Sequence, residues 1–247
     1  MAAIICHYGA EYLPYAIQSL YDAVDQIHLW YTRDPSFGRT SDRPCPETEV
    51  ELYAAAKQYD PDRKVVWHRG IYYTEGDHRR IYEKFAADMG FHIVVVCDTD
   101  EVWDTESLKK ALPEVLASPR QRFRVPMVHL WQDFDAVCKD LAQPVRFYKP
   151  DGEGEGYVPL DKAVWHFGYA IDDDLMAYKW SGIHGHQDEL REGWMENTWL
   201  ARKTEDVHPA NLNFWDAVPY DKHQLPAFME GHPRWTHKRL KPWPKQP

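Results

Sequence analysis

Two spacings of apolar residues alternate along the first half of the chain. Short apolar runs, typical of buried strands, occur at 3–8, 27–31, 64–68 and 92–97. Between them, apolar residues recur every three or four positions, which predicts helices over 13–24, 48–59 and 77–89. This β-α-β-α-β order with short connections predicts a mainly parallel sheet with helices on both faces. The run 92–97 is the most apolar, so we expect it to be the central strand.

Residues that begin or end helices support these boundaries. Gly90 follows the helix predicted over 77–89 and suits a left-handed C-terminal stop. Asp104 can cap a further helix over 105–116, because its carboxylate accepts a hydrogen bond from an early backbone N–H.

The alternation of predicted strands and helices ends after this helix. The pattern predicts a strand over 122–131 and two more, at 145–148 and 162–167, on either side of a glycine-rich tip. The final stretch mixes helical segments with proline-rich loops. No repeat and no linker is evident, so the sequence predicts one α/β domain over 1–247 with an irregular C-terminal half.

Composition narrows the class of protein. Hydrophobic residues make up 44% of the 247 residues and aromatic residues 14%, which indicates a globular chain rather than a disordered one. No apolar run approaches the ~20 residues that span a bilayer, so we expect no membrane span. The first residues lack a basic segment and a cleavage site, and the four cysteines form no close pair. These features predict a cytoplasmic protein.

The net charge of −10 disfavours nucleic-acid binding by the chain as a whole. Residues 232–247 differ, because they contain five Lys or Arg and no acidic residue. This basic tail is interpreted either as a solvated extension or as a segment that contacts a polyanion.

Asp98-Thr99-Asp100-Glu101 directly follows the predicted central strand. Ligands of open α/β sheets bind outside the carboxyl ends of the strands. Three carboxylates in four residues repel one another unless a cation lies there, and Mg²⁺ or Mn²⁺ is the natural partner of such oxygen ligands. Asp98 and Asp100 are expected to alternate in side-chain direction with Thr99, so that both can reach one ion. The competing interpretation is an acidic loop that caps the next helix.

Several segments resemble GT-A glycosyltransferases, in particular family-2-like enzymes of small bacterial or phage type. The run IVVVCDTDEVWD resembles their metal-binding strand end, and CHYGAEYLPYAIQSLYDAVDQIHLWYT resembles their nucleotide-binding start. WHFGYAIDDDLMAYKW and HPANLNFW…VPYDKHQLPAFMEGHPRW resemble later segments of the same group.

This resemblance implies a GT-A-like α/β sandwich and a metal-dependent glycosyltransferase of hexosyltransferase type, with a nucleotide-sugar donor that is expected to be UDP-linked. Asp98 would face the ribose or base and Asp100 would bind the ion. Tyr8 and Glu11 follow the first strand, where such enzymes place the nucleotide. Residues 1–131 would form the nucleotide-sugar-binding half, 132–231 the acceptor half and 232–247 the basic tail.

Basic and imidazole side chains elsewhere are further candidates. Arg79 and Arg80 lie on the predicted helix before the acidic run and either reach a phosphate or form a solvated face. Neutral imidazole can complete a coordination sphere begun by carboxylates, and the resemblance implies a late histidine ligand. The candidates for that ligand are His166, His184 and His186. Lys179 lies near them in the sequence and either pairs with the diphosphate or is an ordinary surface lysine.

An inverting transferase needs a carboxylate that deprotonates the acceptor hydroxyl. Asp188 and Glu189 are favoured for this role, and Asp133 and Asp135 are alternatives. Among the aromatic residues of the second half, Trp194 and Trp199 are expected in the core, whereas Trp131 is expected beside the acceptor.

The acceptor is either a surface glycan or a hydroxylated base in phage DNA. A metal-dependent phosphoesterase or nuclease that uses the same carboxylates is the alternative function. A sugar-binding module without catalysis is a third possibility, which the placement of the acidic run disfavours.

Overall fold

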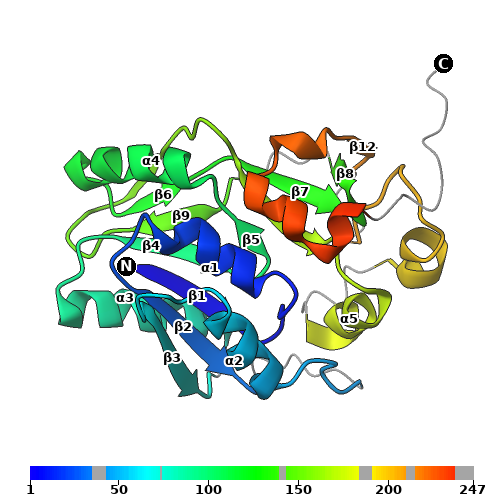
Figure 1. The fold of residues 1–247 in the computed structure, drawn as a ribbon, viewed down its shortest axis with the longest axis horizontal. Coiled ribbons are helices and arrows are strands. Elements are labelled where there is room, and N and C mark those ends of the chain that lie inside the picture. Colours follow the sequence, from blue (N-terminus) through cyan, green and yellow to red (C-terminus); the bar gives the residue numbers. More distant parts are fainter. Residues whose placement is uncertain (35–42, 73, 139–142, 184–190, 210–214, 237–247) are drawn as a thin grey trace. The chain divides into compact units, whose positions relative to one another are not determined.

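The computed structural model describes residues 1–34, 43–72, 74–138, 143–183, 191–209 and 215–236 (Figure 1). Its residues divide into two compact units, each with its own internal contacts. The first comprises 1–40, 47–127 and 142–164, and the second comprises 41–46, 128–141 and 165–247. Among the described residues, no helix is both long enough and apolar enough to cross a bilayer.

The first unit is built on a seven-stranded sheet with the order β10-β6-β9-β4-β1-β2-β3. Its strands are β1 (Ala2–Cys6), β2 (Ile27–Thr32), β3 (Val65–Gly70), β4 (Val94–Asp98), β6 (Arg122–Arg124), β9 (Val145–Tyr148) and β10 (Glu155–Tyr157). Strand β9 is antiparallel to both its neighbours, and the other pairs are parallel. A two-residue strand, β5 (Glu101–Val102), follows β4. The central sheet is therefore mostly parallel, and β4 is its middle strand, as the sequence predicts.

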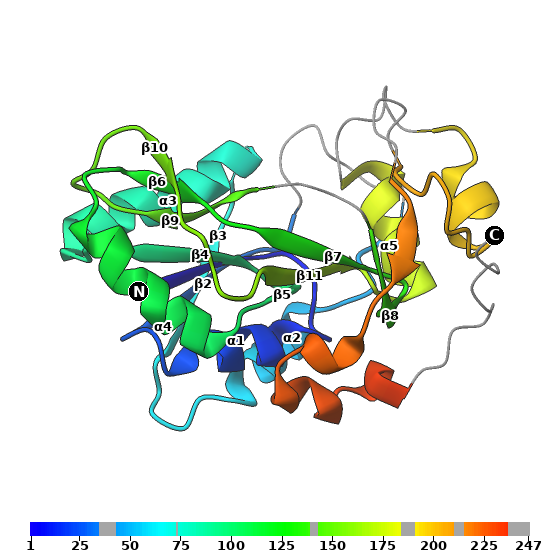
Figure 2. The ribbon, with the colours of Figure 1, turned by 90° about the horizontal axis from the view of Figure 1, so that it is seen from above.

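Helices cover both faces of this sheet because successive strand residues point to opposite sides. Four helices belong to the unit: α1 (Leu13–Tyr21), α2 (Glu49–Lys57), α3 (Glu75–Met89) and α4 (Thr105–Ala117). Ile4 and Cys97 belong to the apolar core that also contains residues of α1, α2 and α4. Ala3 and Val96, one residue away, belong to a second core that includes Tyr82 and Ala86 of α3 (Figure 2).

Helix boundaries follow the capping residues identified in the sequence. Asp104 accepts a hydrogen bond from Ser107 N at 2.9 Å, as expected of the N-cap of α4. Gly90 ends α3 with φ 74°, the left-handed conformation predicted for it. Thr48 and Glu51 form a reciprocal capping box at the start of α2, which the sequence analysis did not single out.

The second unit contains strands that neighbour one another in the order β12-β8-β7-β11. These strands are β7 (Met127–Trp131), β8 (Asp133–Cys138), β11 (Val164–Tyr169) and β12 (Ala217–Pro219). Helix α5 and short helical turns complete it: α5 (Asp173–Tyr178), η1 (Lys179–Ile183), η3 (Met195–Trp199), η4 (Lys222–Gln224), η5 (Ala227–Gly231) and η6 (Pro233–Thr236). The second half is thus more regular than the pattern predicts, because β8 and β12 were not expected.

The strand predicted over 122–131 is wrong as a single element. It is interrupted at Val125 and Pro126, and its two parts, β6 and β7, join different sheets. Proline lacks the N–H that a continuous ladder needs, so a strand is readily broken there. The predicted core positions Trp194 and Trp199 are confirmed, since both are buried.

A buried histidine in the first unit leads to a pH-dependent prediction. His28 of β2 is 3% exposed, its Nδ1 lies 2.8 Å from His68 Nε2 and its Nε2 lies 2.9 Å from Gln26 Oε1. Burial, followed by the nearby His68 charge, lowers the pKa of His28 to about 4. In the unfolded chain the pKa of a histidine is about 6.5, so as the pH falls His28 takes up a proton in the unfolded chain before it does so in the folded protein.

We expect the free energy of unfolding to decrease by roughly 2–3 kcal/mol through this group between pH 6.5 and pH 4. Denaturant titrations at several pH values would measure the decrease, and His28→Phe should remove most of it. Exposed His92 provides the control, because His92→Gln should leave the pH dependence unchanged. An unaltered pH dependence in His28→Phe would show that another group is responsible.

Candidate functional site

The strand order places a topological switch point between β1 and β4. The chain runs from β1 to β2 and β3 on one side, and then returns to β4 on the other side of β1. Because β1 and β4 are parallel, their carboxyl ends meet at the same edge of the sheet. Crevices at such a point are where ligands of open α/β sheets bind. Asp98, the last residue of β4, lies at this edge.

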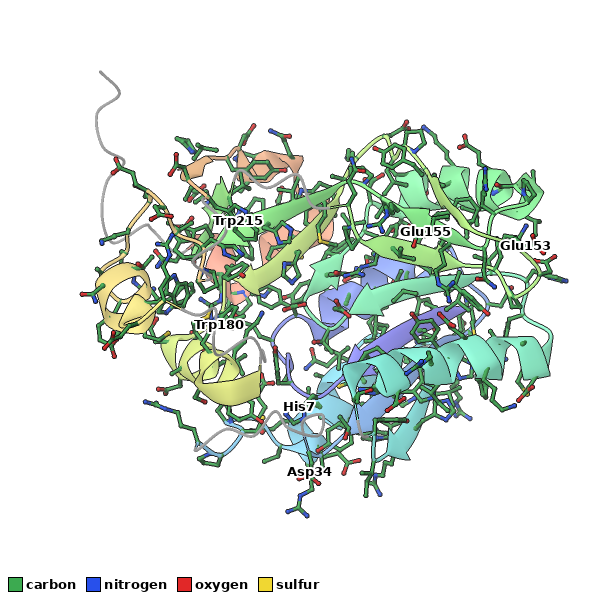
Figure 3. All side chains as sticks on the ribbon, turned by 180° about the vertical axis from the view of Figure 1, so that it is seen from behind. His7, Asp34, Glu153, Glu155, Trp180 and Trp215 are labelled. Carbon is green, nitrogen blue, oxygen red and sulfur yellow. The ribbon has the colours of Figure 1, made fainter. Side chains whose placement is uncertain are left out.

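The loops that follow the two strands are held together by hydrogen bonds. Thr99 Oγ1 donates to the Tyr8 carbonyl oxygen at 2.7 Å, which joins the loop after β4 to the loop after β1. His7 Nδ1 lies 2.9 Å from the carbonyl oxygen of Thr32, at the end of β2. His7 and Asp34 mark these ends of β1 and β2 in Figure 3. Tyr8 and Asp98, predicted as nucleotide-binding residues, therefore lie at the same edge of the sheet, in the loop after β1 and at the end of β4.

A carboxylate from a distant segment anchors the loop after β1. The backbone N–H groups of Gly9 and Ala10 both donate to Glu47, the latter at 3.1 Å. Burial raises the pKa of Glu47, and these two hydrogen bonds oppose the shift. Glu47 was not identified in the sequence, because nothing in its local pattern indicates a partner 38 residues away.

Gly9 is required by the close approach of these two loops. Its φ is 108°, and a Cβ at this position would collide with the Thr99 side chain. We expect Gly9→Ala to lower the free energy of unfolding by about 1–3 kcal/mol, since backbone strain adds to the collision. Gly90→Ala is the matched control, because Gly90 also has positive φ but no atom within 4 Å of the added Cβ. Equal losses in the two variants, measured by denaturant titration, would contradict the proposed tight loop contact.

The acidic run is partly neutralised by an arginine from β9. Arg146 Nη2 donates to Asp98 Oδ2 at 2.9 Å, and Arg146 Nε donates to Glu101 Oε2 at 2.8 Å. Glu101 is fully buried and Arg146 is 7% exposed, so the pair is almost excluded from water. Glu101 also accepts a hydrogen bond from the Asp98 backbone N–H at 3.1 Å. The guanidinium thus orients both the Asp98 side chain and the turn that follows it.

Two carboxylates, Asp98 and Glu101, share this one guanidinium, and the pKa of Glu101 reflects both its burial and this sharing. Burial raises the pKa of Glu101 to about 7, while Arg146 acts in the opposite direction. Burial disfavours the charge on Arg146, but the attraction of Glu101 and Asp98 outweighs this and holds its pKa above the usual value. Arg146 therefore stays charged near neutral pH.

The backbone differs from the prediction at the acidic run itself. Strand β4 ends at Asp98, and Thr99 and Asp100 form a turn rather than a continued strand. The simple alternation expected for Asp98 and Asp100 is therefore wrong. Asp100 is 6% exposed and lies in the turn that is fixed by the Thr99 hydroxyl.

Asp98 and Asp100, the predicted ligands of a hard divalent ion, lie at the end of β4 and in the turn that follows it. Among the described residues, no group of three or more His, Cys, Asp or Glu side chains is placed to hold a metal. Mg²⁺ sites commonly use one or two carboxylates and take their remaining ligands from water and substrate phosphates. Asp98 and Asp100 supply carboxylates of this kind at a sheet edge where ligands bind.

The remaining candidates in the first unit occupy different positions. Glu11 is half-buried and precedes α1. Arg80 lies on the surface of α3, where its Nη2 pairs with Asp77 at 3.0 Å and its Nε donates to the Gly76 carbonyl oxygen. These bonds favour the interpretation of Arg80 as part of a solvated helix face. Arg79 also lies on α3, and its side chain is outside the described part of the structure.

His166 and Lys179 lie close together in the second unit. A Cβ on Gly168 would be 2.6 Å from His166 Nε2 and 2.8 Å from Lys179 Nζ, so both groups border the same small space. Lys179 is 3% exposed and donates to the Gly168 carbonyl oxygen at 3.0 Å, which excludes the alternative of an ordinary surface lysine. His166 Nδ1 lies 2.8 Å from Nδ1 of His129, a residue that the sequence analysis did not select.

The other acceptor-side candidates have mixed outcomes. Asp133 is buried, and its Oδ1 accepts a hydrogen bond from Asp135 N at 2.9 Å. Trp131 is fully buried and donates to the Lys203 carbonyl oxygen at 3.0 Å, so the expectation that it contacts an acceptor is wrong. The other predicted positions, which are His184, His186, Asp188, Glu189 and residues 237–247 of the basic tail, lie outside the described residues.

Arg146 was also missed, although a sequence signal existed. It interrupts the apolar run Val145–Tyr148, and a charged residue in a buried strand requires a partner of opposite charge.

Comparisons with known proteins give little further information. No protein-family model matches the chain, and no curated protein matches it. Among solved structures, it is similar to glucosyl-3-phosphoglycerate synthase from Mycobacterium tuberculosis, determined in complex with Mn²⁺, uridine diphosphate and phosphoglyceric acid. That match has a TM-score of 0.35 and 11% identity, and covers 51% of this chain and 42% of that chain.

Proposed function

We propose that the chain is a metal-dependent glycosyltransferase that moves a sugar from a nucleotide-sugar donor to an acceptor hydroxyl. The observation that carries this proposal is the position of Asp98 and Asp100 at the switch point between β1 and β4. The loop of Tyr8 and Gly9 borders the same edge, where it can form a wall for the nucleotide.

In this proposal, Asp98 and Asp100 hold Mn²⁺ or Mg²⁺ together with the donor diphosphate. A divalent ion at that place would stabilise the negative charge that develops on the departing nucleoside diphosphate. Arg146 keeps Asp98 in a fixed orientation before the donor binds, which lowers the entropic cost of assembling the site. Thr99 has a matching role, because its hydrogen bond to Tyr8 holds the two loops in register.

The acceptor hydroxyl needs a base within hydrogen-bond reach as it attacks the sugar. Asp188 and Glu189 remain the proposed bases for an inverting reaction, with Asp133 as the alternative. Asp133 is buried and already accepts one backbone hydrogen bond, which holds its carboxylate in place. We expect that replacing the carboxylate that acts as the base by its amide lowers the rate of sugar transfer about 10²- to 10⁴-fold, while the affinity for the donor stays almost unchanged.

A panel of nucleotide sugars tests the function directly. Each donor is incubated with the full chain, with and without Mn²⁺, and the release of nucleoside diphosphate and the shift in melting temperature are measured. The proposal predicts a metal-dependent shift and release for at least one donor, with a UDP-sugar expected. Turnover of simple phosphoesters without any response to nucleotide sugars would instead support the alternative of a phosphoesterase or nuclease.

A further inference from the structure

A small pocket lies in the second unit, among residues to which no role has been assigned above. Its volume is about 190 Å³, and its walls include Trp180, Trp194, Arg191 and Glu196. Pockets for drug-sized ligands are usually larger, at about 300–1,000 Å³. The pocket is therefore suited to a single ring rather than to a nucleotide.

Hydrogen bonds fix the wall that carries Arg191. Its backbone N–H donates to the Pro209 carbonyl oxygen at 2.8 Å, and its Nη1 donates to the Asp206 carbonyl oxygen at 2.9 Å. The guanidinium also pairs with the Asp206 carboxylate. Trp194 Nε1 donates to the Val207 carbonyl oxygen at 2.9 Å, which binds the same two segments together.

A turn at Gly193 forms another part of the pocket wall. Gly193 has φ 67°, and a Cβ there would lie 2.5 Å from Asn197 Nδ2, so a side chain at this position would disturb the wall. The Gly193 carbonyl oxygen accepts a hydrogen bond from Asn197 N at 2.8 Å. The pocket is thus formed by backbone that is held in one conformation.

The aromatic walls are held by packing. The Trp180 ring stacks on Tyr169, with centroids 6.3 Å apart and planes inclined by 16°. Trp194 lies 5.7 Å from Trp180 with an interplanar angle of 58°, so the two indoles form a corner rather than a parallel clamp. Trp194 is 5% exposed, whereas Trp180 is half-buried and is labelled in Figure 3.

We propose that this pocket binds one pyranose ring of a glycan acceptor; the acceptor role rests on the proposed glycosyltransferase function. The C–H face of a sugar ring packs on an indole, as apolar groups do on aromatic faces. Sugar hydroxyls both donate and accept hydrogen bonds, so a guanidinium, which only donates, and a carboxylate, which only accepts, are complementary to them. A nucleobase would favour parallel aromatic surfaces, which the 58° corner does not provide.

Saturation-transfer difference NMR on the full chain tests the pocket without a donor or a metal. The probes are methyl glycosides of glucose, galactose, N-acetylglucosamine and N-acetylgalactosamine. At least one should receive saturation from the wild-type protein. Trp180→Ala should weaken its binding on the order of tenfold, the loss expected when one aromatic stacking surface is removed. Glu196→Gln should weaken it by a smaller factor, because the amide keeps an acceptor oxygen.

Trp235 is the matched control, since it is a partly exposed tryptophan of the same unit whose ring contacts Lys222 and Phe134 instead. Trp235→Ala should leave glycoside binding unchanged. Binding that persists in Trp180→Ala, an equal loss in Trp235→Ala, or no binding of any probe to the wild type would overturn the assignment.

The donor assay keeps this inference separate from the proposed function. Trp180→Ala should raise the KM of a glycan acceptor by a larger factor than it changes the KM of the nucleotide-sugar donor. If the protein binds glycosides through Trp180 but cleaves no nucleotide sugar, the pocket assignment is supported and the transferase proposal is contradicted. If it cleaves the donor but binds none of the glycosides, the transferase proposal is supported and the pocket assignment is contradicted.

Discussion

Asp100→Asn is expected to abolish metal-dependent transfer while the fold is retained. Removing a ligand that stabilises the charge of the leaving group should reduce the rate on the order of 10²-fold or more. The substitution conserves volume and removes one of several neighbouring negative charges, so the free energy of unfolding without metal should stay the same or rise. The diagnostic readout is the melting-temperature shift caused by Mn²⁺ and UDP together, which the variant should lose.

Asp151→Asn is the control for Asp100→Asn. Asp151 belongs to the same unit, its side chain is 75% exposed and its contact with Lys149 is 3.9 Å long. This variant should keep both the wild-type rate and the Mn²⁺-dependent shift. Full activity of Asp100→Asn in the presence of EDTA would refute the metal site.

Arg146→Met is expected to be the most destabilising substitution of the first unit that we predict. It leaves the fully buried Glu101 without its guanidinium, and breaking a buried ion pair from one side typically costs about 3–5 kcal/mol. Denaturant titration of the variant should show this loss. Adding Glu101→Gln should restore part of it, because the amide is neutral without having to take up a proton in the buried site.

A surface ion pair provides the comparison. Lys110 and Asp161 form a salt bridge, but their side chains are 70% and 63% exposed. Lys110→Ala should therefore leave the free energy of unfolding nearly unchanged. If Arg146→Met were no more destabilising than Lys110→Ala, the buried cluster would not contribute to stability as proposed. If the Arg146→Met and Glu101→Gln effects simply added, the two side chains would not interact energetically.

Local signals in the sequence were sufficient for the elements of the first unit. Buried strands and amphipathic helices leave periods of two and 3.6 in the apolar pattern, and the expected order agrees with β1 to α4. Asp104 and Gly90 act where their side chains or backbone freedom predict, because capping depends on residues only a few positions away. The apolarity of 92–97 also indicated the middle strand, since that strand is covered on both faces.

The sequence predicted less about the strand that was broken at Pro126. Whether β6 and β7 continue one sheet or join two depends on their partners: β6 pairs with β9 and β10, whereas β7 lies between β8 and β11. The strand β12 was missed because a three-residue strand such as Ala217–Pro219 is too short to show a period in the apolar pattern, and the six-residue strand β8 was missed as well.

Within the candidate site, the sequence alone predicted that the acidic run binds a hard divalent ion, because carboxylates crowded at a strand end repel one another unless a cation lies among them. Only the tertiary structure showed that Arg146, 48 residues along the chain, pairs with Asp98, and that Glu47 holds the amides of Gly9 and Ala10. The structure also shows that Trp131 is buried in the core and not, as expected, beside the acceptor. The chemistry of a side chain depends only on the residue type, so it can be inferred directly from the sequence. Burial and pairing depend on contacts between segments that only the folded chain brings together.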